Sequence, residues 1–165
     1  VAEETTDGLD IAAHLRVPTA KAGEFALSLG YTYVFNHTIR QYPGDPVIDK
    51  LRYDSNYDIP REKGTASITW TLDRFSTTLT GQRLGKLPNY DEDGYIKPSY
   101  IFNLTARYDV TDRLRVTGTI NNLFDQAPIY DSTYGSYPYY DISWFDGVGR
   151  SFYLQLTYKM GGSPL

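Results

Sequence analysis

Cysteine is absent from this chain of 165 residues, which excludes disulfide bridges and thiolate metal sites. Histidine occurs only as His14 and His37, and neither has a partner at the spacing of a metal site or a catalytic triad. The net charge of −4 argues against a nucleic-acid partner. No nucleophile elbow and no phosphate-binding glycine loop appears. We therefore expect no metal, no cofactor and no enzymatic activity.

Long apolar runs are also missing, and without about 18 consecutive apolar residues the chain has no transmembrane helix. A membrane-spanning strand needs only roughly 9–11 residues, of which alternate ones are apolar. Tyrosine, in contrast, is abundant, with 16 residues beside 7 Phe and 2 Trp. Tyr and Trp gather at membrane interfaces because one end of each ring favours hydrocarbon and the other favours water. The composition therefore leaves a membrane-embedded sheet open.

Alternation of apolar and polar residues with a period of two recurs along the chain. In residues 64–72, for example, Ala66, Ile68 and Trp70 alternate with threonine and serine. This period, with its enrichment in Thr, Tyr and Phe, predicts β-strands. The segments that follow the pattern are 8–17, 24–35, 64–72, 75–83, 100–110, 113–124 and 150–160. We predict an all-β, antiparallel fold of about seven strands.

The connections between these segments alternate between short and long. Residues 18–23, 73–74 and 111–112 are short, whereas 41–60, 84–98 and 125–149 are long. A soluble β-sandwich has no reason to sort its loops in this way, but an outer-membrane barrel has short periplasmic turns and long extracellular loops. The pattern predicts a segment of a transmembrane β-barrel in the outer membrane of a Gram-negative bacterium, in contact with its lipid.

Aromatic residues support the same orientation. With the short turns in the periplasm, aromatic side chains fall at both ends of the strands, as the two interfacial belts of a membrane barrel require. The predicted membrane-interface residues are Trp70, Phe75, Tyr108 and Tyr158 at the periplasmic end, and Tyr33, Phe35, Phe124 and Phe152 at the extracellular end.

Seven strands cannot close an antiparallel barrel, because closure requires an even number. One interpretation is that the chain is part of a larger barrel, whose wide lumen would suit inward residues that are mostly Ser, Thr, Asn and Gln. The alternative is an eighth strand hidden in a long loop. That would give a small self-contained barrel with a structural or adhesive role.

Short motifs near the end of the chain add a family resemblance. Residues 121–128 read Asn-Asn-Leu-Phe-Asp-Gln-Ala-Pro, and residues 149–153 read Gly-Arg-Ser-Phe-Tyr. Upstream, Gly-Leu-Asp at 8–10 opens a strand and Ile-Pro-Arg at 59–61 precedes another. In their order and spacing these motifs resemble the C-terminal β-barrel portion of a TonB-dependent outer-membrane receptor.

The resemblance implies a barrel of about 22 strands whose lumen holds a plug domain. Residues 1–160 would be the C-terminal part of the barrel, and 161–165 a short tail after Met160, where the family usually ends in an aromatic residue. The partners implied are the plug and other strands of the same receptor and the TonB system, reached through the N-terminal part. The implied function is energy-coupled uptake of a bulky, scarce nutrient. A ferric siderophore is the commonest ligand of the family, while an oligosaccharide or a peptide would fit the loops as well.

Two groups of loop residues are candidates for a small ligand. Aromatic residues in the longest loop can stack on a ligand or pack the loop onto itself, and the sequence leaves both readings open. These candidates are Tyr134, Tyr137, Tyr139, Tyr140 and Trp144. Acidic residues in 41–60 and 91–93 offer oxygen ligands for Ca²⁺, but their spacing matches no EF-hand, and a solvated acidic loop is the competing interpretation.

Overall fold

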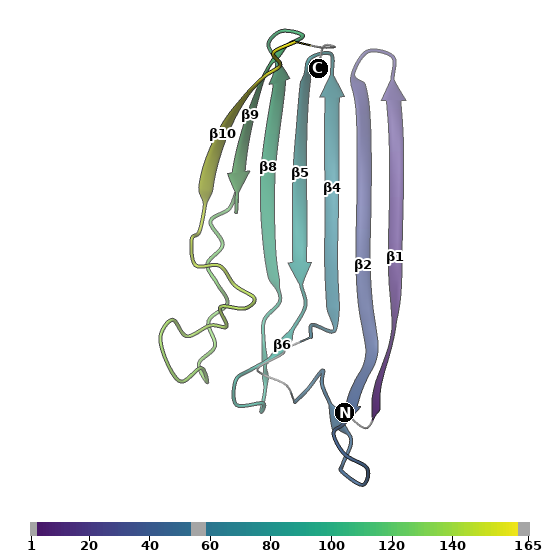
Figure 1. Cartoon of the computed structure of the whole chain (residues 1–165), viewed down its shortest axis with the longest axis vertical. Coiled ribbons are helices and arrows are strands. Elements are labelled where there is room, and N and C mark those ends of the chain that lie inside the picture. Colours follow the sequence, from purple (N-terminus) through teal and green to yellow (C-terminus); the bar gives the residue numbers. More distant parts are fainter. Residues whose placement is uncertain (1–2, 54–58, 162–165) are drawn as a thin grey trace.

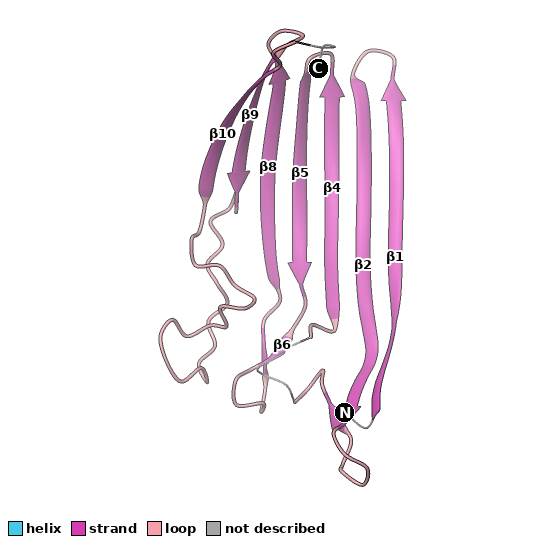
Figure 2. Ribbon diagram, in the orientation of Figure 1, coloured by secondary structure: helices cyan, strands magenta, loops and turns pink. Residues whose placement is uncertain are grey.

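The computed structural model of the chain describes residues 3–53 and 59–161, and it consists of strands and loops (Figure 2). Seven strands form the main sheet, and three short strands of two residues each lie in the loops. Their bounds are β1 Glu3–Thr19, β2 Gly23–Arg40, β3 Ile48–Asp49, β4 Glu62–Leu72, β5 Phe75–Leu84, β6 Leu87–Pro88, β7 Tyr95–Ile96, β8 Ser99–Asp109, β9 Leu114–Asn121 and β10 Ser151–Tyr158. Within the described ranges, no helix is long and apolar enough to cross a membrane.

The main sheet is antiparallel throughout and follows the order β1-β2-β4-β5-β8-β9-β10 (Figure 1). The predicted number of seven wall strands is confirmed. β1 and β10 occupy opposite edges of this open sheet, so the described residues do not close into a small barrel. Of the short strands in the long loops, β3 pairs only with Thr38 and Ile39 of β2, and β6 and β7 pair with each other, so none supplies an eighth wall strand. The self-contained eight-stranded barrel is therefore wrong for this structure.

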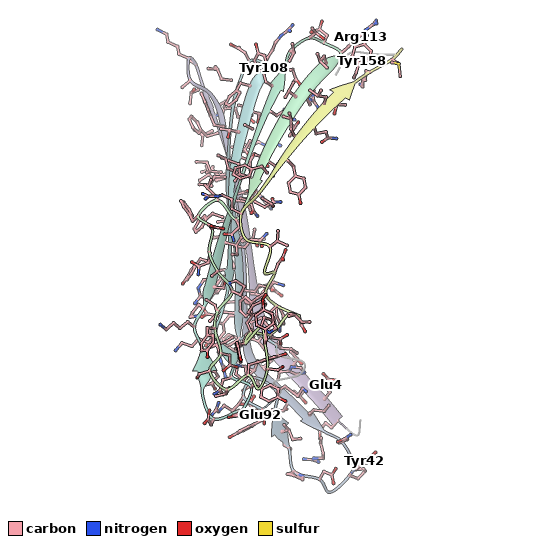
Figure 3. The ribbon with its side chains drawn as sticks, turned by 90° about the vertical axis from the view of Figure 1, so that its left-hand side faces the viewer. Glu4, Tyr42, Glu92, Tyr108, Arg113 and Tyr158 are labelled. Atoms are coloured by element: carbon pink, nitrogen blue, oxygen red, sulfur yellow. The ribbon has the colours of Figure 1, made fainter. Side chains whose placement is uncertain are left out.

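The predicted sorting of the loops is also present. All three tight turns lie at one end of the sheet, and the long loops lie at the other (Figure 1). In the tight turns, Gly23 and Asp73 take positive φ angles of 79° and 49°, as hairpins with such short connections require. Seen from the side, the strands twist, and Tyr108, Arg113 and Tyr158 mark the short-turn end while Glu4, Tyr42 and Glu92 mark the long-loop end (Figure 3).

The strand register aligns the alternating pattern across the whole sheet. Leu27 pairs with Leu15 and Ile68, and Leu79 pairs with Ile68 and Leu104. Since neighbouring residues of a strand point to opposite faces, one face carries these apolar residues and the other carries their polar neighbours, such as Thr80 and Ser67. We call them the apolar face and the polar face.

The apolar face is not covered by a second layer of the described chain. Leu154 on β10 is 75% exposed, and many other large apolar side chains of the sheet are exposed as well. Among the described residues the buried hydrophobic side chains are Leu51, Leu87 and Phe145, all in the long loops. A soluble sandwich would bury one face of each sheet against the other. An exposed apolar face of this extent marks a surface that meets lipid or protein.

Three strand boundaries differ from the prediction by more than two residues. β1 and β2 extend past the alternating region to Glu3 and Arg40. A register shift between Asp7 and Gly8 separates this extension from the alternating region. Polar pairs stabilise the extension, such as Glu3 and Arg40, whose side chains approach to 3.5 Å. β9 ends at Asn121, so Phe124 lies in the following turn rather than on a strand. At these boundaries polar side chains and turn geometry decide where the strand ends, not apolar alternation.

Candidate ligand-binding site

A cavity of about 670 Å³ lies at the long-loop end of the sheet, between the polar face and the loop of residues 122–150. The strands supply its floor and the loop supplies a wall. Side chains from five strands and the loop line it, among them Lys63, Thr65, Gln82, Ser99, Asn103, Asn121, Gln126, Trp144, Phe145, Asp146, Ser151 and Tyr153. Loops on a rigid sheet are a common place for ligand binding, so we take this cavity as the candidate site.

The motif at residues 121–128 fixes the beginning of the loop. Asn122, which is 8% exposed and has a φ of 49°, donates from Nδ2 to the Gln126 carbonyl and accepts from the Gln126 amide at Oδ1, both at 2.8 Å. Asp125 Oδ1 accepts a hydrogen bond of 2.8 Å from the amide of Arg150. Arg150 in turn donates from Nη1 to the Leu123 carbonyl at 3.3 Å. The motifs at 121–128 and 149–153, two of those on which the family resemblance rests, are thus joined, and together they hold both ends of the loop.

The acidic residues of this loop form turns. Asp131 accepts hydrogen bonds from the amide and the hydroxyl of Thr133, at 2.9 and 2.7 Å. Asp141 accepts from the amide of Ser143 at 2.7 Å, and Asp146 accepts from the amide of Val148 at 2.9 Å. Short polar side chains commonly close turns in this way.

The three long loops contact one another. The other carboxylate oxygen of Asp131 accepts from the amide of Tyr90 at 2.9 Å, which links loop 122–150 to loop 85–98. Arg52 of the preceding loop donates from Nη1 to the Gly94 carbonyl at 3.0 Å, and its guanidinium lies 4.8 Å from the centre of the Tyr95 ring. The loops therefore support each other above the sheet.

Of the predicted ligand-binding aromatic residues, Trp144 lines the cavity. The ammonium of Lys63 lies 5.7 Å from the centre of its ring, a cation–π arrangement. Trp144 follows the turn of Asp141, whose carbonyl accepts its amide at 3.2 Å. Tyr153 on β10 lines the same cavity but was not a candidate, because it lies in a strand. Its position among the polar residues of the alternating pattern was the signal that could have found it.

The other four candidates lie outside the cavity lining. The ring of Tyr134 packs against the ring of Tyr90, with centroids 5.2 Å apart. This residue therefore packs one loop onto another, as the second interpretation of the aromatic residues proposed. Tyr137 and Tyr139 form a surface cluster with centroids 6.3 Å apart, and Tyr137 is 86% exposed. Tyr140 is half-buried in the same loop. The structure thus brings one of the five predicted residues into the cavity.

Few charged residues line the cavity. They are Lys63, Arg83 and Asp146. Arg83 is engaged toward the apolar face, where Nη2 lies 2.5 Å from Glu62 Oε1 and Nε donates to the Tyr100 hydroxyl at 3.1 Å. The positive charge of Lys63 and the negative charge of Asp146 offset each other in the lining. The walls therefore present mainly amides, hydroxyls and aromatic rings.

The short-turn end of the polar face is charged. Arg115 donates from Nε to Asp109 Oδ1 at 2.5 Å, between directly paired residues of β9 and β8. Arg107 lies on the same face and is exposed.

The predicted interface aromatics lie at the two ends of the sheet. At the short-turn end, the rings of Trp70 and Phe75 are 5.8 Å apart, Phe75 pairs with Tyr108, and Tyr158 ends β10. At the long-loop end, the ring centroids of Tyr33 and Phe35 are 5.5 Å apart, and those of Phe124 and Phe102 are 5.3 Å apart. Phe152 lies near the start of β10. This placement follows the predicted belts, and their role at a membrane interface stays a prediction.

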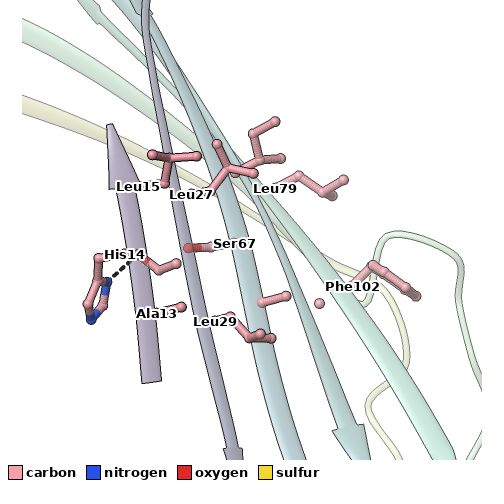
Figure 4. Close-up of a pocket in the computed structure, with 12 residues that line it drawn as sticks. Ala13, His14, Leu15, Leu27, Leu29, Ser67, Leu79 and Phe102 are labelled. Carbon is pink, nitrogen blue, oxygen red and sulfur yellow. Dashed lines mark hydrogen bonds between the residues drawn. The ribbon is translucent and has the colours of Figure 1, made fainter. Parts of the chain in front are cut away.

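The apolar face carries a hollow of its own, of about 570 Å³ (Figure 4). Small residues at Ala13, Ala66 and Gly81 form part of it, and Leu27, Leu79 and Phe102 surround them. A Cβ atom added at Gly81 would approach the Phe102 ring to 2.9 Å, so the glycine makes room for this ring. His14, on the opposite side of β1, bonds Ser28 through Nδ1 at 3.0 Å and points away from these apolar residues (Figure 4).

In the part of the chain that the structure describes, the remaining histidine and acidic loop residues such as Asp93 have other partners. His37 is 5% exposed and its Nε2 lies 2.8 Å from Glu4 Oε1. Asp93 accepts a hydrogen bond from the side chain of Asn89 at 2.6 Å. Within residues 3–53 and 59–161, no three His, Asp or Glu side chains are grouped to hold a metal ion. Two acidic residues of the predicted Ca²⁺ candidates, Asp54 and Asp58, lie outside the described residues.

Comparison with known proteins identifies the family. The family model for the β-barrel of TonB-dependent receptor-like proteins matches residues 1–123. A variant of the ferric enterobactin receptor PfeA of Pseudomonas aeruginosa shares 21% identity over 93% of this chain and 22% of its own, with a TM-score of 0.63. Another variant, solved with enterobactin, shares 20% identity over the same fractions, with a TM-score of 0.59. This chain thus spans 22% of the length of these receptors, and the likeness is one of fold. No curated protein matches the chain.

Proposed function

The chain belongs to the TonB-dependent receptor β-barrel family, and on that premise we propose that it forms part of a receptor that imports a bulky, scarce nutrient. It contributes seven neighbouring strands to the barrel wall and three long loops to the ligand-binding surface. The receptor lies in the outer membrane of a Gram-negative bacterium, where proteins of this family are found. The remaining strands, a plug domain and the TonB system are its partners, and the ligand crosses chemically unchanged.

The observation that carries the proposal is the contrast between the two faces of a single-layer sheet. The apolar face is exposed from β1 to β10, as a barrel wall in lipid requires. The polar face carries the cavity beneath loop 122–150 at the end with the long loops. A receptor of this family needs a wall that faces lipid and a ligand site on the inner side near the long loops, and the contrast between the two faces supports both roles.

A ferric siderophore is the first ligand class to test, because the solved structures with this fold are named as ferric enterobactin receptors. At 20–21% identity the likeness extends to fold alone, so it does not carry the ligand over. An oligosaccharide or a peptide suits the aromatic residues of the loops as well.

Energy-dependent uptake tests the proposed function. The full-length receptor that contains this chain would be expressed in cells that lack other receptors of its class. These cells would be offered ferric enterobactin, neutral oligosaccharides and peptides in turn. We expect uptake of at least one class, and loss of that uptake when the TonB complex is deleted. Uptake that persists without the complex, or a receptor that fractionates away from the outer membrane, would contradict the proposal.

A further inference from the structure

We infer that the cavity beneath loop 122–150 takes a neutral, hydroxyl-rich ligand of the oligosaccharide class. The inference rests on the proposed uptake function and names the ligand class for that same site. It is carried by three features of the cavity wall, which are its free amides, its aromatic rings and its small net charge.

Side-chain amides dominate the polar part of the wall. Gln82 enters from β5 and is exposed, and its amide has no hydrogen-bond partner within the described chain. Asn103 accepts from the backbone amide of Asn122 at 2.9 Å through Oδ1, which leaves its two Nδ2 hydrogens to be donated. An amide offers both donors and an acceptor, and a sugar hydroxyl also acts as both. Such a wall can match a hydroxyl-rich ligand without any change of protonation.

Two aromatic rings come from different elements. Trp144 belongs to the loop, and Tyr153, 62% exposed, rises from the start of β10. Rings of this kind combine a flat apolar surface with a polar edge, which suits the C–H faces and hydroxyl rims of a pyranose. Trp144 is held in place by its backbone bond to Asp141 and by Lys63 across its ring. A ligand therefore meets a largely preorganised ring, which reduces the entropic cost of binding.

Charge argues against a multiply anionic ferric catecholate in this cavity. Of the two cations of the wall, Arg83 is paired with Glu62, while the Lys63 ammonium lies over the Trp144 ring and keeps its charge. The carboxylate of Asp146 adds a negative charge to the lining. A multiply charged anion transferred from water to such a wall would lose hydration and would meet a single ammonium, which the Asp146 carboxylate offsets in sign. A neutral ligand avoids this cost.

Binding to the full-length receptor in detergent tests the inference. The probes are short neutral gluco-, manno-, xylo- and galacto-oligosaccharides, and ferric enterobactin is the anionic comparison. Calorimetry measures the binding of each probe. At least one neutral probe should bind. The variants Trp144→Ala and Gln82→Leu should each weaken it by ~10-fold or more, the loss expected for one ring or one buried hydrogen-bonding group. Tyr137→Ala, which removes an exposed aromatic residue of the same loop outside the cavity, should leave affinity unchanged.

Two results would overturn the inference. One is that no neutral oligosaccharide binds, whether or not ferric enterobactin does. The other is that an oligosaccharide binds but its affinity is unaffected by both cavity variants, which would place the site elsewhere. If no neutral oligosaccharide binds but ferric enterobactin uptake requires the TonB complex, the neutral ligand is ruled out while the receptor function stays intact. Failure of the receptor function itself would appear separately, as uptake that is independent of that complex.

Discussion

The two faces of this sheet are built from the same strands, yet each has its own hollow and its own chemistry. On the apolar face, Ala13, Ala66 and Gly81 lie among leucines, isoleucine and phenylalanine. On the polar face, Gln82 and Asn103 lie under a loop that is fixed by hydrogen bonds. Gly81 and Gln82 are neighbours in sequence but belong to different surfaces. One face needs only apolar area, whereas the other depends on the position of individual donors and acceptors.

The comparison shows how strictly the register must be kept. A slip of one residue in any strand would exchange its two faces, placing Gln82 in lipid and Gly81 in the cavity. The unbroken register from β2 to β10 prevents this exchange. The effects of substitutions on the two faces should therefore differ in kind as well as in size.

The largest difference between the faces should come from a charge at mid-strand. Leu79→Arg places a guanidinium on the apolar face and should destabilise the full-length receptor by about 2–4 kcal/mol if that face meets the bilayer centre. Thr80→Arg, one residue later and on the polar face, is the matched control and should cost much less. Unfolding in lipid vesicles measures both, and equal losses would refute the assignment of the faces.

A smaller loss should follow removal of the anchor at the beginning of loop 122–150. Asn122→Ala deletes two hydrogen bonds of a buried side chain, which is worth about 1–3 kcal/mol of local stability. The barrel should remain folded while limited proteolysis cuts the loop faster. Asn36→Ala, which breaks an exposed bond to Asp7, serves as the control. A cleavage rate that is the same in both variants would show that Asn122 does not hold the loop.

The smallest effect is expected at the predicted interface on the apolar face. Trp70 donates from Nε1 to the Ala22 carbonyl at 2.7 Å. Trp70→Phe keeps an aromatic ring and loses this bond, so we expect about 0.5–1.5 kcal/mol of destabilisation. Trp70→Ala should cost more, because it also removes the contact with Phe75. If the two variants lose the same stability, the ring contributes nothing beyond its hydrogen bond.

The wall strands could be predicted because each of them carries its own period of two. Residues 75–83, for instance, correspond to β5 Phe75–Leu84 within one residue. Loop lengths predicted the two ends of the sheet for a similar reason, since they are counted along the chain. The extension of β1 and β2 to Glu3 and Arg40 escaped prediction, because its strand pairing is supported by polar pairs that leave no apolar alternation.

The candidate site was predictable only in part. Loop 122–150 was identified from its length and its aromatic residues, but composition cannot separate Trp144, which lines the cavity, from Tyr134, which packs on Tyr90. Tyr153 and Gln82 escaped attention because residues of regular strands resemble every other polar position of the pattern. Their significance depends on which loop covers them, and that is a long-range contact.

The sequence by itself determined the strands, the two faces and the parity of the loops, because alternation and turn chemistry act between residues a few positions apart. The tertiary structure alone decided how loop 122–150 lies over the polar face and how its two motifs meet through Asp125 and Arg150. It also decided which charges remain free, since Arg83 is engaged by Glu62 from another strand. Contacts of this kind join residues about 20 positions or more apart, and no local pattern in the chain encodes them.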